Sequence, residues 1–147
     1  MIVGFPQETE EDFEESYEFV KKIHFYETHI FKYSRRHGTV ADRMEDQVDE
    51  QVKNSRSDRL LAIEAELEKQ YQQKFPDQTQ KVLIEEPVLI EGTKYLVGYN
   101  ERYVRIAVPY EEGVSDESLC NSLIDVHING SLEGDILLGK RERACNL

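Results

Sequence analysis

Two polar stretches carry the residue types that could bind a ligand. The first spans residues 33–39 and follows a short apolar run; it holds two arginines, a histidine, a serine, a threonine and a glycine. Donors at the end of a strand are typical of ligand sites in α/β sheets, but an ordinary strand–loop–helix connection looks the same. The second spans residues 98–105, where two tyrosines and two arginines are interleaved. Such residues can stack on bases and hold phosphates, although a tyrosine-rich hairpin without a ligand fits equally well.

Motifs for catalysis or metal binding are missing from the sequence. The four histidines show no ligand spacing such as His-x-x-x-His, and His29 and His127 alternate with apolar residues in β-prone runs. The chain has no Gly-x-Ser-x-Gly, no Walker loop and no paired catalytic carboxylates. Cys120 and Cys145 fit reduced thiols of a cytosolic protein better than a disulfide framework. We therefore assign no catalytic residue and no metal ligand.

The first polar stretch requires a strand before it, and the local pattern supplies one. Residues 2–5 and 28–33 are predicted strands, and residues 9–24 are a predicted helix between them. Thr9 has the side chain of an N-cap, with Asp12 three residues later as in a capping box. The helix should bury one apolar stripe, Phe13, Tyr17, Val20 and Ile23. A strand, helix and strand of this length form a parallel β-α-β unit.

A long helix is predicted over residues 48–75, because apolar residues recur there at spacings of three and four. Its buried stripe would be Val52, Arg56, Leu60, Ile63, Leu67, Tyr71 and Phe75. The opposite face, which includes Lys53 and Arg59, is charged and should face solvent. Pro76 ends the helix.

The second polar stretch belongs to a β-rich module. Five short β-prone runs are separated by turn signals, over residues 81–85, 94–97, 103–108, 123–128 and 135–138. Five short strands in so few residues predict a small closed barrel of the OB-like size. Pro87 and Pro109 should lie at strand ends, because proline cannot donate to a sheet.

Composition limits the partners. The chain has 147 residues and a formal net charge of −12, and residues 77–147 hold 13 acidic and 7 basic residues. This argues against strong charge-driven nucleic-acid binding, while a local basic patch stays possible. No apolar run reaches the ~18 residues of a membrane span. The amino terminus does not look like a signal peptide, so we expect a cytoplasmic protein with no membrane partner.

Several segments resemble one family, in order along the chain. Ile-Val-Gly-Phe-Pro-x-Glu-Thr at residues 2–9 is similar to the Gly-Phe-Pro-Gly-Glu-Thr strand of radical S-adenosylmethionine methylthiotransferases. Residues 29–44 resemble the family's last barrel strand and following loop, and residues 46–60 its linker helix. Gly-Tyr-x-x-x-Tyr-Val at residues 98–104 resembles its TRAM domain. The His-x-Phe-x-Tyr-Ser pattern at residues 29–34 looks most like the branch that modifies threonylcarbamoyladenosine in tRNA.

The resemblance implies a mixed α+β chain in three parts. Residues 1–45 would be the C-terminal part of a radical S-adenosylmethionine barrel, residues 46–76 a linker helix, and residues 77–147 a small antiparallel TRAM barrel that binds RNA. The full-length enzyme would use two iron–sulfur (4Fe-4S) clusters and S-adenosylmethionine to methylthiolate an adenosine near the tRNA anticodon.

The resemblance also assigns roles to residues. The cofactor-binding positions would be Gly4, Glu8, Ser34, Arg36 and Thr39. The surface facing the anticodon stem-loop of tRNA would be Tyr99, Arg102, Tyr103 and Arg105. Because residues 77–147 are acidic, we expect this RNA binding to be weak and sensitive to salt.

The sequence departs from the family pattern in ways that matter. The Cys-x-x-x-Cys-x-x-Cys loop that holds the radical cluster is absent, Gln7 stands where the family has glycine, and Val40 where proline is usual. We therefore expect a C-terminal piece that binds no cluster and is inactive alone. A single β-α-β unit leaves its sheet uncovered, so we expect either a homodimer through the exposed strands or partial disorder in residues 1–45. Alternatives are a free-standing TRAM-type RNA-binding or adaptor protein, and an inactive remnant.

Overall fold

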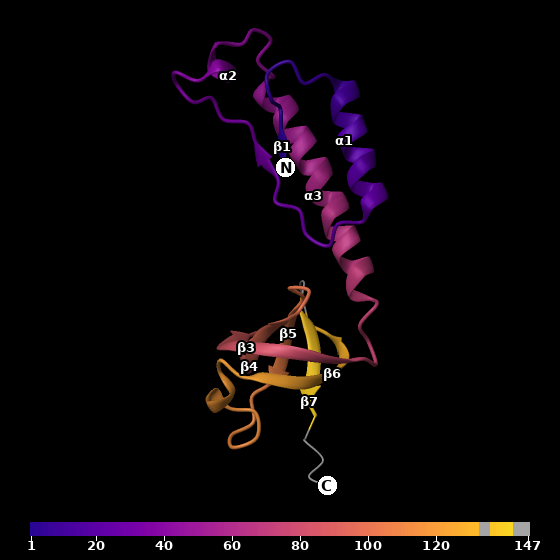
Figure 1. The fold of residues 1–147 in the computed structure, drawn as a ribbon, viewed down its shortest axis with the longest axis vertical. Coiled ribbons are helices and arrows are strands. Elements are labelled where there is room, and N and C mark those ends of the chain that lie inside the picture. The colour runs from indigo at the N-terminus through magenta and orange to yellow at the C-terminus, as the bar shows by residue number, and fades with distance from the viewer. Residues whose placement is uncertain (133–135, 143–147) are drawn as a thin grey trace. The chain divides into compact units, whose positions relative to one another are not determined.

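A computed structural model of the protein describes residues 1–132 and 136–142. The chain divides into two compact units, Met1–Tyr71 and Gln72–Leu147, which we describe separately (Figure 1). None of the helices in these described ranges combines the length and apolar character needed to cross a membrane. The three-part division at residues 45 and 76 stays a prediction.

The first unit contains a parallel β-α-β arrangement. β1 (Ile2–Val3) pairs in parallel with β2 (Phe31–Lys32), and α1 (Glu10–Ile23) connects them. The hydroxyl of Thr9 accepts a hydrogen bond from the backbone N–H of Asp12, whose carboxylate accepts one from the backbone N–H of Thr9. The capping box therefore forms as predicted and fixes where α1 begins.

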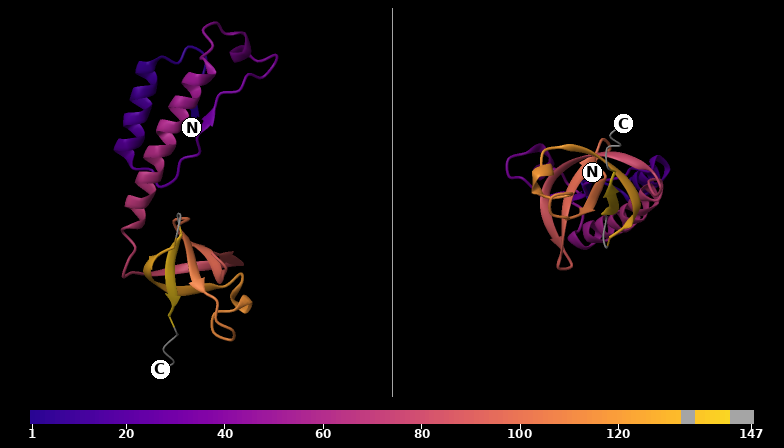
Figure 2. Two further views of the ribbon diagram at one scale, coloured as in Figure 1. Left: turned by 180° about the vertical axis from the view of Figure 1, so that it is seen from behind. Right: turned by 90° about the horizontal axis from the view of Figure 1, so that it is seen from below.

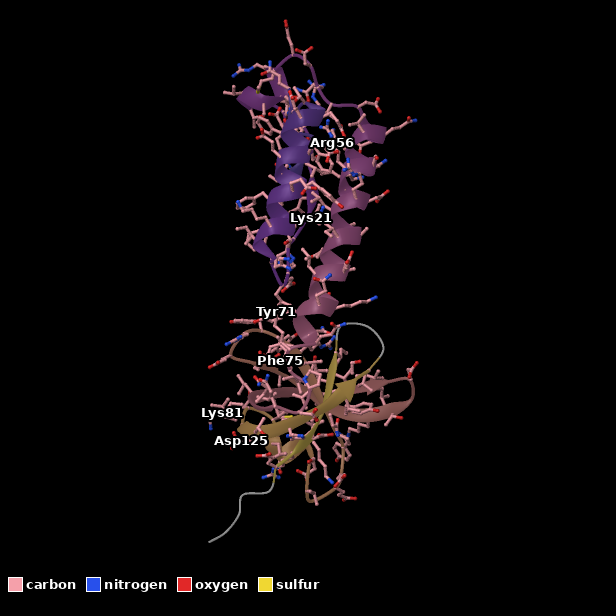
Figure 3. All side chains as sticks on the ribbon, turned by 90° about the vertical axis from the view of Figure 1, so that its right-hand side faces the viewer. Lys21, Arg56, Tyr71, Phe75, Lys81 and Asp125 are labelled. Atoms are coloured by element: carbon pink, nitrogen blue, oxygen red, sulfur yellow. The ribbon has the colours of Figure 1, made fainter. Side chains whose placement is uncertain are left out.

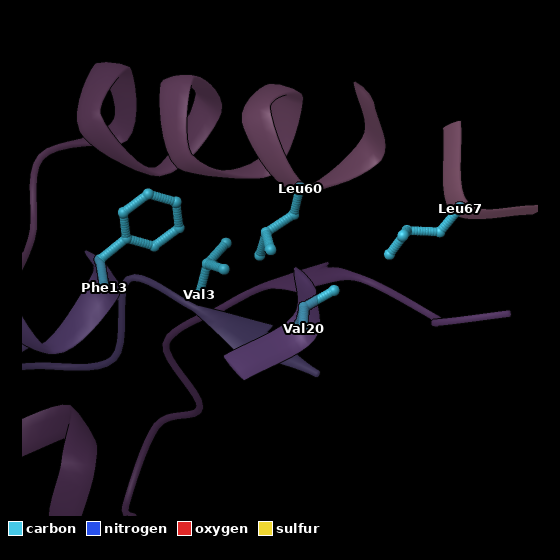
Figure 4. Packing of buried hydrophobic residues seen from close by; sticks show 5 residues of the cluster. All are labelled: Val3, Phe13, Val20, Leu60 and Leu67. Atoms are coloured by element: carbon cyan, nitrogen blue, oxygen red, sulfur yellow. The ribbon is translucent and has the colours of Figure 1, made fainter. Parts of the chain in front are cut away.

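The long helix α3 (Glu50–Gln72) lies beside α1 in both ribbon views (Figures 1 and 2). Side chains from β1, α1 and α3 meet in one buried cluster, Val3, Phe13, Val20, Leu60 and Leu67 (Figure 4). Burying each large side chain of this kind contributes about 1.5–3 kcal/mol. The predicted helix thus packs as an integral part of the first unit.

Some details of the predicted stripes are wrong. Ile23 and Val52 are 47% and 37% exposed, whereas Lys53, expected on the solvated face, is only 7% exposed. The stem of Lys53 packs against Gly4, because a glycine there leaves room that a lysine stem can cover. α3 also ends before Phe75, which is buried in the second unit.

A short helix, α2 (Val40–Arg43), lies inside the segment expected to be a polar loop. Thr39 caps it, since its hydroxyl accepts a hydrogen bond from the backbone N–H of Asp42 at 3.1 Å. The Thr-x-x-Asp spacing is the same signal that marks the start of α1. Val40, the residue that replaces the family's proline, is exposed at the first position of this helix.

The second unit is the expected small barrel. Five strands close in the order β3-β4-β5-β7-β6, and their ring is visible end-on in Figure 2. All pairs are antiparallel except β5 with β7. The strands are β3 (Thr79–Ile90), β4 (Thr93–Asn100), β5 (Arg105–Pro109), β6 (Leu123–Ser131) and β7 (Leu137–Arg141). A 3-10 turn (Glu117–Leu119) precedes β6. The mixed fold predicted from the sequence is confirmed.

β3 is longer than predicted and runs through Pro87, so the prediction that this proline ends a strand is wrong. The register of β3 shifts between Ile84 and Glu86, and β6 pairs with β3 only as far as Leu83. Pro87 therefore lies on a stretch with one free edge, where a missing N–H costs nothing. Pro109 ends β5 as predicted.

The interior of the barrel is filled by alternate residues of its strands. Fully buried members are Val82, Ile84, Leu96, Ile106, Val126 and Ile128. Gly98 of β4 lies so close to β3 that a Cβ atom there would sit 1.9 Å from the carbonyl oxygen of Leu83. A glycine is thus required where β4, on which the second polar stretch begins, approaches β3.

Candidate functional site

Gly4 and Glu8 lie together in the loop that follows β1. The backbone N–H of Gly4 donates to Oε2 of Glu8, and Gly4 has a φ of +73°. A Cβ atom at Gly4 would lie 2.2 Å from Cγ of Lys53. Both the backbone angle and the close approach of Lys53 demand glycine at this position.

Glu8 is held by a buried arginine of α3. Nη1 of Arg56 donates to Oε2 of Glu8 at 2.7 Å and to its backbone oxygen at 3.1 Å, and Nη2 donates to Oε2 of Glu10 at 3.0 Å. The side chains of Arg56 and Glu8 are 6% and 14% exposed. Figure 3 marks Arg56 within the first unit. Glu8 thus fixes the loop to α3 through a nearly dry ion pair.

Ser34, Arg36 and Thr39 follow β2. The hydroxyl of Thr39 donates to the backbone oxygen of Arg36 at 2.8 Å while it caps α2. Ser34 and the side chain of Arg36 are exposed. Arg35 lies beside them in an ion pair with Asp42 at 3.1 Å. In this loop Ser34, the Arg36 guanidinium and the fully exposed imidazole of His37 are therefore groups that a ligand could reach.

The loops after β1 and β2 meet through Tyr33. Its backbone N–H donates to the oxygen of Val3 at 2.8 Å, and its ring contacts Phe5 edge-on, with centroids 5.3 Å apart. Nζ of Lys53 lies 5.7 Å from the Tyr33 ring centroid. The Tyr33 hydroxyl is buried and has no hydrogen-bond partner among the residues that the structure describes. Sequence reasoning missed Lys53, because no local pattern reveals that its stem covers Gly4.

A shared carboxylate links the lysines near this rim. Glu50 lies 3.2 Å from Nζ of Lys32 and 3.3 Å from Nζ of Lys53. The hydrogen bond from Lys32, reinforced by that from Lys53, holds the pKa of Glu50 below its ordinary value. The ammonium of Lys53 is thereby compensated despite the burial of its stem.

The five predicted cofactor-binding residues form two pairs, with Ser34 apart. Gly4 contacts Glu8, and Arg36 contacts Thr39. The carboxylate of Glu8 is occupied by internal partners, and the Thr39 hydroxyl by its helix cap. Within the described ranges, no hydrogen bond joins one pair to the other or to Ser34.

Tyr99, Tyr103 and Arg105 gather at one end of the β4–β5 pair. Tyr99 is the strand partner of both Leu83 on β3 and Arg105 on β5. The rings of Tyr99 and Tyr103 are 6.3 Å apart, and Tyr103 is 77% exposed. Tyr103 lies in the turn before β5 with a φ of 59°, not in the strand predicted to begin there.

Asn100 organises this turn from a buried position, at 5% exposure. Its Oδ1 accepts the backbone N–H groups of Arg102 and Val104, both at 3.0 Å, and its Nδ2 donates to Oε1 of Gln80 at 3.2 Å. These bonds hold the turn in a shape that gives Tyr103 a positive φ, which a bulky residue rarely adopts. Asn100 is a positioning residue that sequence reasoning missed, although asparagine is a common turn residue.

Metal-binding groups are not brought together in the described ranges. Within residues 1–132 and 136–142, no cluster of three or more His, Cys, Asp or Glu side chains could hold a metal ion. Cys120 is half-buried with a free thiol, and Cys145 lies outside the described residues.

Comparison with known proteins gives clear relatives, although no protein-family model matches the chain. It is 46% identical over 107 residues to the threonylcarbamoyladenosine tRNA methylthiotransferase MtaB of Bacillus subtilis (strain 168), covering 72% of this chain and 24% of that protein. It is 38% identical over 141 residues to a tRNA-2-methylthio-N(6)-dimethylallyladenosine synthase of Acetivibrio thermocellus, covering 93% of this chain and 28% of that protein.

A third relative bears a different substrate in its name. The ribosomal protein uS12 methylthiotransferase RimO of Clostridium kluyveri is 36% identical over 142 residues, covering 93% of this chain and 30% of that protein. The chain thus spans between 24% and 30% of the length of these three relatives.

Proposed function

The chain belongs to the methylthiotransferase family, and we propose that it is the C-terminal part of a radical S-adenosylmethionine enzyme that methylthiolates N6-threonylcarbamoyladenosine near the tRNA anticodon. The branch is supported by the relative named for this nucleoside, which is 46% identical. Relatives named for other substrates reach 46% and 45% identity over only 85 and 86 residues, or 38% and 36% over 93% of the chain, so the support for this branch is the longer stretch, 107 residues, that is matched at 46%.

We propose a separate role for each of three segments of the chain. Residues 1–45 would supply part of the barrel rim, residues 46–76 the linker helix, and residues 77–147 a TRAM domain that binds RNA. The parallel β1–β2 pair and the closed second barrel are consistent with these roles.

One observation carries the RNA-binding proposal: Tyr99, Tyr103 and Arg105 share one end of the barrel surface. Tyrosine rings stack on bases of any sequence, and an arginine beside them can contact phosphate. Arg102 lies in the same turn. We propose that these four residues contact the anticodon stem-loop of tRNA.

At the rim formed by the loops after β1 and β2, S-adenosylmethionine bound with an iron–sulfur cluster would supply the radical chemistry. We propose that Ser34 and Arg36 contact polar groups at the rim, with Thr39 holding the backbone of that loop. Gly4, whose positive φ and close contact with the Lys53 stem set the path of the loop, would place that loop beside the ligand, and Glu8 would keep the loop in place through Arg56.

We expect these 147 residues to be inactive by themselves, because they contain only two cysteines and no Cys-x-x-x-Cys-x-x-Cys motif. Iron analysis after anaerobic reconstitution and an assay for S-adenosylmethionine cleavage would test this. Iron at cluster stoichiometry together with cleavage would contradict it, whereas RNA binding without either is also the result expected of the alternative, an RNA-binding adaptor.

The proposed RNA binding is tested by titrating a labelled anticodon stem-loop RNA with the 147-residue chain. If two arginines contact a single strand, affinity should fall by about sevenfold between ~50 and ~200 mM salt. Tyr103→Ala with Arg105→Ala should weaken binding at least tenfold by loss of stacking and charge. Tyr110→Ala is the matched control, since Tyr110 follows the far end of β5 and contacts Lys94.

We also propose that the chain forms a homodimer and that it is located in the cytoplasm. A homodimer is supported by the exposed residues of the β1–β2 pair, where Ile2 and Phe31 are strand partners and 58% and 62% exposed. A cytoplasmic location is supported by relatives named for tRNA substrates. Sedimentation of the chain over a range of concentrations tests the dimer, and an Ile2→Ser/Phe31→Ser variant should be monomeric.

A further inference from the structure

We infer that the RNA-binding surface of the barrel extends to two exposed leucines, and that the whole row binds an unpaired RNA segment whose bases are unstacked. The inference rests on the proposed RNA-binding function and specifies the form of RNA that the surface accepts. The row, named here the leucine–tyrosine row, consists of Leu123, Leu83, Tyr99, Tyr103 and Arg105.

Strand register places these side chains next to one another. Leu123 of β6 is the partner of Leu83 of β3, and Leu83 is in turn the partner of Tyr99 of β4. Tyr99 is also the partner of Arg105 of β5. Side chains directly opposite each other on neighbouring strands have Cβ atoms about 5 Å apart, so the row is continuous over four strands.

The row lies on the outside of the barrel. Val82 and Ile84, which flank Leu83, are fully buried, so alternation along β3 directs Leu83 outward. Leu83 and Leu123 are 41% and 69% exposed. Single exposed leucines are ordinary, but two that adjoin the half-buried Tyr99 and the exposed Tyr103 form a continuous apolar surface.

The charges around the row favour unpaired over paired RNA. Within the described residues the Arg105 guanidinium has no ion-pair partner, and its Nε is buried without a hydrogen bond. The next pair on the same face, Lys81 and Asp125, neutralise each other at 3.4 Å (Figure 3). A duplex offers mainly phosphates and needs several free cations, which this face lacks.

In unpaired RNA the flat faces of the bases are accessible to a protein, whereas in a duplex they are stacked on one another. The accessible faces can lie on leucine and tyrosine side chains, while Arg105 contacts one phosphate or base edge. Stacking is tolerant of sequence, so the row would recognise an open loop before it recognises particular bases. Flat apolar contacts also explain how an acidic module could bind RNA.

The test compares two labelled RNAs, a stem-loop with an unpaired loop and a fully paired duplex of equal length, titrated with the 147-residue chain. The variant is Leu83→Ser/Leu123→Ser. Leu89→Ser is the matched control, because Leu89 is also on β3 and is 71% exposed, but pairs with Lys94 away from the row. We expect the double variant to bind the stem-loop about tenfold more weakly, the control within twofold, and the duplex weakly in all cases.

The outcomes separate the inference from the function on which it rests. No binding of either RNA by the parent chain would overturn both. Stem-loop binding that depends on Tyr103 and Arg105 but not on the leucines would overturn the inference alone, and would leave a protein segment as the alternative occupant of the row. Equal loss with Leu89→Ser, or duplex binding as tight as stem-loop binding, would also overturn it. Thermal unfolding of each variant checks that the barrel is intact.

Discussion

At the scale of single residues, Arg56 and Gln7 determine how the loop after β1 is held. Arg56 reaches it from α3 and donates to both the side chain and the backbone of Glu8. Gln7 adopts a φ of 70°, and its backbone N–H donates to the oxygen of Asp46 at 3.0 Å. One contact is an ionic clamp, and the other uses a backbone angle that favours glycine.

Removing Arg56 should destabilise the first unit strongly. Arg56→Ala would leave the Glu8 carboxylate nearly buried without its charge partner, which typically costs about 3–5 kcal/mol. Urea unfolding followed by far-UV circular dichroism would measure the loss. Arg59→Ala is the control, since the Arg59 side chain is 39% exposed and its ion pairs with Glu10 and Glu14 contribute about 0–1 kcal/mol. Equal effects of the two variants would contradict the assignment.

Replacing Gln7 by glycine should stabilise the same unit. A non-glycine residue in the left-handed region costs roughly 1–2 kcal/mol, of which the added freedom of glycine in the unfolded chain returns about half. We expect Gln7→Gly to raise the free energy of unfolding by about 0.5–1 kcal/mol. Gln7→Ala keeps the strain and should bring no gain. A destabilised glycine variant would mean that the Gln7 side chain contributes contacts of its own.

At the scale of elements, the turn between β4 and β5 is the part of the barrel most closely tied to the proposed function. Among the described residues, three side-chain and two backbone hydrogen bonds of Asn100 set its path. Tyr103 is presented at the tip with most of its surface exposed. A fixed turn spares the entropy of ordering the aromatic side chain when RNA binds.

Asn100→Ala tests whether the hydrogen bonds of Asn100 order the turn and so favour RNA binding. The variant leaves two backbone N–H groups without their acceptor and should lower the free energy of barrel unfolding by about 1–3 kcal/mol. RNA affinity should fall as well, because the turn loses its defined shape. Asn100→Asp keeps an acceptor for both N–H groups and should retain more of both properties. An alanine variant with full RNA affinity would show that the turn need not be preordered.

The elements differ in how far the sequence predicted them. The capping box at Thr9, the β-α-β unit and the five-stranded barrel followed from local patterns and are confirmed. The position of Lys53 did not, because it depends on Gly4, a partner far away in sequence. The course of β3 through Pro87 did not either, because a local pattern does not reveal that β6 stops at Leu83 and leaves that edge of β3 unpaired. The pairing of Leu83 with Leu123 was equally hidden, since register across the barrel is set by packing. The roles of the nine predicted site residues stay predictions.

At the scale of the whole molecule, acidic pH should be destabilising. The guanidinium of Arg59 holds the pKa of Glu14 below its ordinary value of 4.5, and hydrogen bonds from Thr9 and Ser118 do the same for Asp12 and Asp116. Groups with lowered pKa bind fewer protons folded than unfolded, so their stabilisation is complete above the unfolded pKa and disappears below the folded one. The melting temperature should fall once the pH drops below about 4.5.

Calorimetry over a pH series would check this prediction. Glu14→Gln should flatten the acid limb slightly, because it removes one of the groups responsible. A melting temperature that is constant down to about pH 3 would contradict it, since Glu14, Asp12 and Asp116 would then titrate alike in the folded and unfolded states.

Because the second unit is a closed barrel, its closure affects which kinds of partner it can recognise. In the strands that the structure describes, the barrel pairs β3 with β6 and β5 with β7, so the sheet closes on itself, while the stretch of β3 beyond Leu83 keeps an unpaired edge that Pro87 makes a poor template for an added strand. Partners that recognise proteins by adding a strand to a sheet require an open edge. Discrimination by this barrel therefore depends on side chains projecting from its surface, and a few substitutions there could redirect it to a new ligand while the main chain stays as it is.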